Sequence, residues 1–382
     1  MSTRRERSGR PVVGATVGAA ISTILPGFLV GALSVQIRTE FGVDEAVYGW
    51  AMSSYFLAAT FGSVLLGRLA QRIGPRRQIV TALLIVAAVD IGIAIVASGF
   101  PTFVVLLAIA GMSNAASQTA INLALTRSGV ERLGLAMAIK QSGMPTASMM
   151  SGIAVPVIAL TFGWRWAFVG ASGVALCSAV AIHSVVAARV TVNAVRQRPA
   201  TPAMTLTIAA VAGGFLSFAA GSLNAWVVES GVDAGLSKGA AGLGLSFGAG
   251  LGIVMRLGWG FRLDVLSIKP FRIGGWMAVI GSLGVVGLAI RSPITHVLAT
   301  LVAFASGWVW PIFTNFGIVR ANSASASAAT GVSQTGVFLG LFAAPLTTGM
   351  IIQAAGYPTM WLMTAGAMLS GALILIAVSD RF

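Results

Sequence analysis

The chain has 382 residues, of which 57% are hydrophobic and only 9% are charged, and its net charge is +14. Soluble domains carry roughly a quarter charged residues, so this composition excludes a soluble globular protein and indicates a membrane protein. A single cysteine, Cys177, and two separated histidines, His183 and His296, exclude a disulfide framework and argue against a metal site. We expect no metal, no cofactor and no enzymatic activity.

Apolar runs define the predicted elements, because a membrane helix needs about 20 mostly apolar residues. The polar stretch 1–11 is interpreted as a cytoplasmic tail, since no small-residue cleavage site follows it. Six runs lie near 12–36, 46–66, 78–98, 101–125, 135–160 and 165–187, and six more near 205–228, 239–260, 271–290, 295–319, 329–353 and 357–378. The sequence therefore predicts an all-α membrane protein with twelve transmembrane helices, arranged as six-helix bundles at 12–188 and 204–382 joined by a cytoplasmic linker at 189–203.

Basic residues predict the orientation of these helices. Of the 24 Lys and Arg residues, 18 lie in segments on the same side as the N-terminus and four lie on the other side. Positive charge collects at the cytoplasmic ends of membrane spans, so both termini of this multi-pass protein are predicted to be cytoplasmic, in the plasma membrane. This distribution explains the net charge without a nucleic-acid partner. The expected partners are the lipid bilayer and a small solute, and we expect a functional monomer.

The two predicted bundles are related by an internal repeat. At a constant offset of 193, without gaps, residues of the first bundle match residues of the second: Gly49 with Gly242, Gly67 with Gly260, Asn122 with Asn315, Arg127 with Arg320, Gln141-Ser142-Gly143 with Gln334-Thr335-Gly336, and Gly163 with Gly356. Parallel repeats of six helices are typical of one large class of transporters, with a substrate site between the halves.

The loop after the second run carries a family resemblance. It reads Gly67-Arg68-Leu69-Ala70-Gln71-Arg72-Ile73-Gly74-Pro75-Arg76-Arg77 and resembles the cytoplasmic signature of the major facilitator superfamily, with Gln71 in place of the usual aspartate. The resemblance implies that fold, and it implies a gating loop formed by Gly67, Arg68, Gly74, Arg76 and Arg77, with Gly260 and Asp264 at the matching positions of the second half. The alternative is that these arginines only follow the charge rule for membrane loops.

Two cations, Lys140 and Arg256, lie within predicted spans, where ionisable residues are costly and are functional candidates. The resemblance implies that helices 5 and 8 pack together, so that both cations flank one cavity. Arg256 precedes Gly260 by four residues and in this is similar to the carboxylate-binding arginine of monocarboxylate and oxalate-type transporters of the superfamily. The alternative is that both side chains extend to lipid headgroups.

Uncharged polar residues give further candidates for solute binding. Asn114, Gln118 and Asn122 are spaced i, i+4, i+8 and form one stripe, which either binds solute or joins helices. Gln141 and Gln334 occupy equivalent positions of the repeat, and Asn224 and Asn315 complete the set. Asp90, in the third run, is a candidate for proton coupling. A hydrogen bond to a neighbouring helix is the explanation that we favour for Asp90.

Together these features favour a secondary transporter that works by alternating access. No Walker-type glycine–lysine loop is present, so a gradient must supply the energy. We expect the cargo to be a small organic anion, because the predicted interior holds Lys140 and Arg256 against only Asp90. The alternative is drug or metabolite efflux, although the interior lacks the acidic residues that exporters of cationic drugs use. A channel, a sensor and a membrane enzyme are disfavoured by the sparse polar residues and the lack of a soluble domain.

Overall fold

The computed structural model describes residues 2–66, 69–127, 139–186, 199–263, 265, 268–322 and 325–382. These residues are mostly helical, and no strand occurs among them. The first half of the chain contributes α1 (Ser2–Ala32), α2 (Ser34–Phe41), α3 (Glu45–Leu66), α4 (Leu69–Ile73), α5 (Pro75–Ile95), α6 (Phe100–Arg127), α8 (Gly143–Ala154), the π-helical turn η1 (Val155–Ala159) and α9 (Arg165–Val185).

The second half contributes α10 (Ala203–Asp233), α11 (Lys238–Leu263), α12 (Pro270–Gly287), α13 (Pro293–Val302), the π-helical turn η2 (Ala303–Gly307), α14 (Trp310–Ala321), α15 (Ala326–Val378) and the 3-10 turn η3 (Ser379–Arg381). The long α15 is two helices joined at Gly356, whose φ of 77° and ψ of 174° are not helical. Proline stands in the first turn of α5, α12, α13 and α14, where its missing N–H costs no hydrogen bond.

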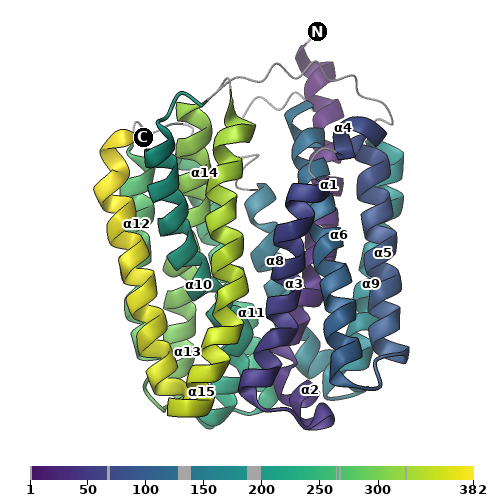
Figure 1. Cartoon of the computed structure of the whole chain (residues 1–382), viewed down its shortest axis with the longest axis vertical. Coiled ribbons are helices and arrows are strands. Elements are labelled where there is room, and N and C mark those ends of the chain that lie inside the picture. The colour runs from purple at the N-terminus through teal and green to yellow at the C-terminus, as the bar shows by residue number, and fades with distance from the viewer. Residues whose placement is uncertain are drawn as a thin grey trace.

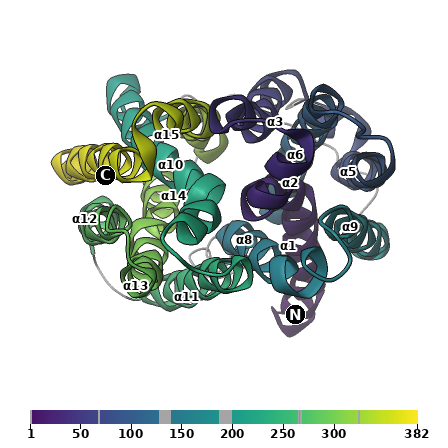
Figure 2. The same cartoon turned by 90° about the horizontal axis from the view of Figure 1, so that it is seen from below.

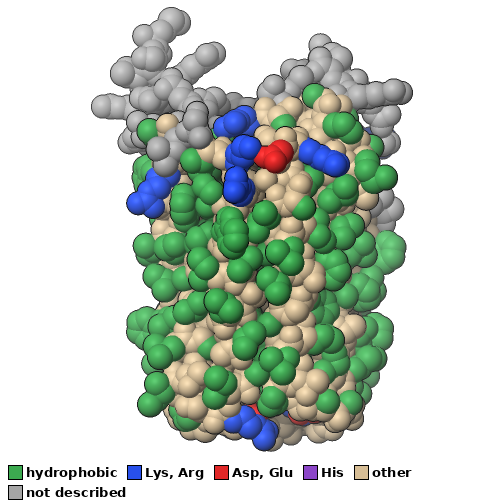
Figure 3. Space-filling view, turned by 90° about the vertical axis from the view of Figure 1, so that its left-hand side faces the viewer, with side chains coloured by type: hydrophobic (Ala, Val, Ile, Leu, Met, Phe, Trp, Pro, Cys, Tyr) green, Lys and Arg blue, Asp and Glu red, His purple; other side chains and the backbone are tan. Residues whose placement is uncertain are grey.

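Nine helical stretches of the described residues are long and apolar enough to cross a membrane. Figure 3 shows hydrophobic side chains over the middle of one face and Lys and Arg mainly near its upper end. The first stretch is Pro11–Ala32, but α1 itself begins at Ser2, so the predicted tail 1–11 is helical from residue 2 onward. Hydropathy detects the part of a helix that crosses lipid, whereas arginine and serine are compatible with continuing the helix into water.

The helices stand in two groups, the first half (α1–α9) and the second half (α10–α15), with both chain termini at one end of the bundle (Figures 1 and 2). The opposite end, where α2 lies, is called the far end below. The halves touch along α3 and α15, along α8 and α11, and along α1 and α10. These contacts place residues of both halves against one another.

Candidate functional site

The α3–α15 and α8–α11 interfaces contain the same hydrogen bond twice. Ser53 Oγ donates to the carbonyl oxygen of Phe342 at 2.8 Å, and Ser246 Oγ donates to the carbonyl oxygen of Met149 at 3.0 Å. Ser246 follows Ser53 by 193 residues, and Phe342 follows Met149 by 193 residues. The sequence repeat is therefore reproduced as a pair of equivalent contacts between the halves.

Glycine allows close approach of the backbones one turn from each serine. A Cβ atom added at Gly49 would lie 2.5 Å from the carbonyl oxygen of Pro345, and one added at Gly242 would lie 2.8 Å from that of Gly152. Real Cβ atoms essentially never approach a neighbour this closely. Gly49 and Gly242 are partners in the repeat, so small residues at both positions let the two halves pack with backbone against backbone, as small residues do in membrane helix pairs.

Arg256 lies in the α8–α11 interface and is 1% exposed. Its Nη1 donates to the carbonyl oxygen of Gln141, in the first half, at 3.2 Å, and its Nη2 donates to the carbonyl oxygen of Trp308. The guanidinium carbon also lies 5.0 Å from the centre of the Trp308 ring, and Nε has no hydrogen-bond partner among the described residues. The charge is thus held by two neutral carbonyls and an aromatic face, and none of the ion pairs between described residues includes Arg256.

Lys140 is adjacent in sequence to Gln141, but its ammonium is directed to its own half. Lys140 Nζ donates to Oδ1 of Asn122, which is exposed on α6. The side chains of the two predicted cations therefore have separate partners. Among the described residues, the hydrogen bond of Arg256 to Gln141 crosses the interface between the halves, whereas that of Lys140 to Asn122 stays within the first half.

A family model described as the Major Facilitator Superfamily matches residues 15–345 of the chain. The chain belongs to the Major Facilitator Superfamily. Among solved structures, the proton:xylose symporter XylE bound to 6-bromo-6-deoxy-D-glucose aligns with a TM-score of 0.72 at 14% identity, covering 96% of this chain and 95% of that chain. At this identity the likeness shows the fold alone. No curated protein matches the chain.

Membership of the superfamily confirms the predicted family and makes the chain a multi-pass membrane transporter rather than an enzyme.

The three residues of the predicted amide stripe differ in burial and in hydrogen-bond partners. Asn114 is 2% exposed and its Oδ1 accepts a hydrogen bond from Thr23 of α1 at 3.0 Å, whereas Gln118 is half-buried and Asn122 accepts from Lys140. Asn114 thus joins two helices of one half.

The other amides also have identifiable places. Asn224 of α10 is 2% exposed and its Oδ1 accepts from Ser148 Oγ of the first half at 2.7 Å, which makes it another contact between the halves. Asn315 donates to the carbonyl oxygen of Pro311 in its own helix at 2.8 Å. The side chains of Gln141 and Gln334 are half-buried.

Asp90 of α5 is fully buried, and neither of its carboxyl oxygens has a hydrogen-bond partner among the described residues. The hydrogen bond to a neighbouring helix that we expected is therefore not found. Since α5 packs against α6 and α9, Asp90 lies away from the interfaces that join the halves.

The predicted gating loop is described in part. Gly67, Arg68 and Asp264 lie outside the described residues. Gly74 precedes α5 with a φ of 88°, a conformation that favours glycine. Gly74 and Gly260 are buried, Arg76 is half-buried and Arg77 is exposed.

Sequence reasoning missed an acidic residue inside a span. The seventh apolar run ends near residue 228, but α10 continues to Asp233 and includes Glu229, which is 9% exposed and is ion-paired with Arg38 of α2. The interior acids therefore include Glu229 as well as Asp90. The available signal was that Glu229 directly follows the apolar residues Trp226-Val227-Val228 and that no proline follows it before Asp233.

Proposed function

We propose that this secondary transporter carries a small organic anion with a carboxylate group, and that Arg256 binds that carboxylate. The observation that supports the proposal is the environment of Arg256, a buried guanidinium with no acidic partner among the described residues and with Nε unsatisfied. Burying an unpaired charge is costly, and such residues persist where they serve function.

The chemistry of the guanidinium favours a carboxylate over its present partners. Arginine presents parallel N–H donors that match two carboxylate oxygens, and a carboxylate brings a full negative charge that the carbonyl oxygens of Gln141 and Trp308 lack. An arriving carboxylate would therefore displace the carbonyl oxygen of Gln141 from Nη1. Because Gln141 belongs to the other half, binding would exchange a contact between the halves for a contact with solute, which is how solute binding becomes linked to alternating access.

Twelve transmembrane helices are part of the proposal. The nine apolar stretches become ten if α15 is divided at Gly356, and α3 together with α8–η1 raises the number to twelve. We assign them to bundles at 12–188 and 204–382 with a linker at 189–203, acting as a monomer in the plasma membrane. The end that holds the termini faces the cytoplasm, because most Lys and Arg lie on that side, so the far end faces outward.

Ligand-dependent stabilisation of the purified protein tests the substrate class. A ligand that binds the folded state raises its apparent melting temperature, so small carboxylates should raise it while neutral sugars and cationic drugs should not. Arg256→Gln should abolish that shift. Arg262→Gln is the matched control, because Arg262 is on the same helix and lies 5.5 Å from the Trp259 ring, but is exposed.

Two results would refute the proposal. If Arg256→Gln folds and keeps the full shift with carboxylates, Arg256 is not the binding residue. If cationic drugs stabilise the protein and carboxylates do not, the efflux alternative is correct.

A further inference from the structure

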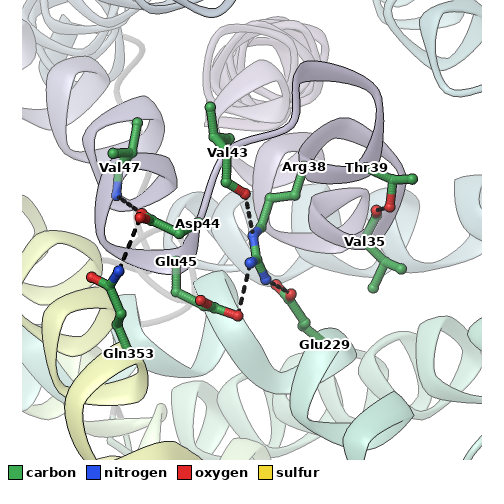
Figure 4. A network of polar contacts seen from close by, with 9 residues as sticks. All are labelled: Val35, Arg38, Thr39, Val43, Asp44, Glu45, Val47, Glu229 and Gln353. Atoms are coloured by element: carbon green, nitrogen blue, oxygen red, sulfur yellow. Dashed lines mark hydrogen bonds and ion pairs between the residues drawn. The ribbon is translucent and has the colours of Figure 1, made fainter.

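Arg38 has three partners at the far end of the molecule (Figure 4). Its Nη2 lies 2.7 Å from Oε1 of Glu45, its Nη1 is paired with Oε1 of Glu229, and its Nε donates to the carbonyl oxygen of Val43 at 3.2 Å. The side chains are largely buried, with exposures of 17% for Arg38, 24% for Glu45 and 11% for Glu229. Each of the three nitrogens of the guanidinium thus has a partner in one small polar cluster.

The three partners of Arg38 do not belong to the same half. Val43 and Glu45 lie with Arg38 in the first half, whereas Glu229 lies on α10 in the second half. A second contact between the halves stands beside this cluster, since Gln353 Nε2 of α15 donates to Oδ2 of Asp44 at 2.9 Å. The far end is therefore closed by two polar contacts between the halves, and Arg38 is the cation in one of them.

The charge of Arg38 does not depend on Glu229 alone. Burial by itself lowers the pKa of the guanidinium, but the carboxylates of Glu229 and Glu45 outweigh burial and raise that pKa. Arginine is protonated at all physiological pH values, so Arg38 keeps its charge in every conformation of the transporter, and a neighbouring carboxylate stabilises that charge wherever the side chain stays largely buried.

We propose that Arg38 is the gate residue of the far end. It is paired with two carboxylates while the halves are closed there and with one carboxylate after the halves separate. Arg38 keeps Glu45 and loses Glu229, so opening breaks one ion pair without leaving an arginine unpaired. Glu45 therefore favours the open state, because it stabilises Arg38 when Glu229 has left and repels Glu229 when the gate is closed. Glu229 favours the closed state. That the far end faces the outside of the cell rests on the orientation proposed above.

The proposal predicts that Glu229 and Glu45 have opposite effects on the fraction of molecules that are open at the far end. Glu229→Gln removes the ion pair between the halves and should increase the open fraction. Glu45→Gln removes the partner that remains in the open state and should decrease the open fraction. Asp233→Asn is the matched control, because Asp233 is ion-paired at the same end with Arg291 at 3.0 Å but both residues belong to the second half.

Labelling of one cysteine measures the open fraction. Ser34 lies at the start of α2 and is fully buried, so Ser34→Cys in a Cys177→Ser background should react with a membrane-impermeant maleimide only when the far end opens. Cys177 is the single native cysteine. In proteoliposomes, Glu229→Gln should raise the labelling rate and Glu45→Gln should lower it, each by roughly 1.5- to fivefold, the range expected for partly exposed ion pairs. Asp233→Asn should leave the rate unchanged.

The pattern of signs decides the outcome. If both carboxylate variants raise the labelling rate, the cluster only stabilises the fold, and if neither changes it, Arg38 is not a gate residue; either result overturns the proposal. Should Glu229→Gln fail to fold, Arg38→Lys replaces it. The compact ammonium of lysine lacks the planar fork with which Arg38 reaches both carboxylates, so this variant should also raise the rate. The side from which the cysteine is labelled tests the proposed orientation separately, so an error in orientation does not affect the test of the gate.

Discussion

The serine hydrogen bonds shared by the α3–α15 and α8–α11 interfaces give a quantitative prediction. Ser53→Ala and Ser246→Ala each remove one hydroxyl that donates to a carbonyl in the other half. Those carbonyls lie within helices, so losing the hydroxyl does not leave them without a partner. A hydrogen bond between membrane helices contributes on average about 0.6 kcal/mol, so each variant should raise the open fraction at the far end about threefold.

The position of Ser53 explains why the far end should respond. Ser53 is eight residues from Glu45, where α3 begins at the far end, and a helix rises 1.5 Å per residue, so it lies roughly 12 Å along a helix of 22 residues. Separation of the halves at the far end therefore stretches this contact. Ser246 is the equivalent residue of the repeat and should respond equally, and the double variant should show about an eightfold change, because distant sites add.

Labelling of Ser34→Cys in the Cys177→Ser background measures all three variants. Equal effects of the two single variants, with the double variant near their product, would support an energetic role for the repeated hydrogen bonds. If Ser53→Ala changes the labelling rate and Ser246→Ala does not, the two interfaces have the same geometry but contribute differently to the stability of the closed state. No effect in either variant would refute the reasoning altogether.

Three further predictions concern single residues. Gly49→Ala places a Cβ 2.5 Å from the Pro345 carbonyl oxygen and should prevent closure of the far end, seen as faster labelling, whereas Gly244→Ala, with nothing within 4 Å, should not. Asp90→Asn should retain folding and uptake, because the amide has nearly the same shape and Asp90 lies away from the interface; loss of uptake would instead indicate proton coupling. Gly74→Ala forces a φ of 88° on a residue with a Cβ and should destabilise the protein by about 1 to 3 kcal/mol, measured by thermal unfolding.

The repeat made much of this architecture predictable. The matching of Gly49 with Gly242 at an offset of 193 predicted equivalent helices, and both glycines stand at backbone contacts between the halves. The repeat and the apolar runs can be read from the residue type at each position alone. The helical membrane fold could therefore be predicted from the sequence.

The partners of each polar side chain were not predictable in the same way. Arg256 and Lys140 were expected to flank one cavity. The side chain of Arg256 contacts Gln141 and Trp308, and that of Lys140 contacts Asn122. Which carbonyl a long side chain reaches depends on the rotation of one helix against another, and hydropathy carries no information on that rotation. Glu229 was left outside the seventh run because a charged residue ends an apolar run, although its helix continues and its carboxylate is paired with Arg38.

The repeat is broken at the candidate binding residue, and this has a consequence for how a solute travels. The position equivalent to Arg256 is Ser63, whose hydroxyl donates to the carbonyl oxygen of Thr60 in its own helix at 2.7 Å. A carboxylate held by Arg256 therefore has no equivalent cation to turn toward as the halves reorient. The solute would cross with its carboxylate bound to the second half of the protein throughout. The opposite end of the solute would be exposed to water whenever either side opens. Recognition would therefore depend on the orientation of the bound solute as well as on its charge.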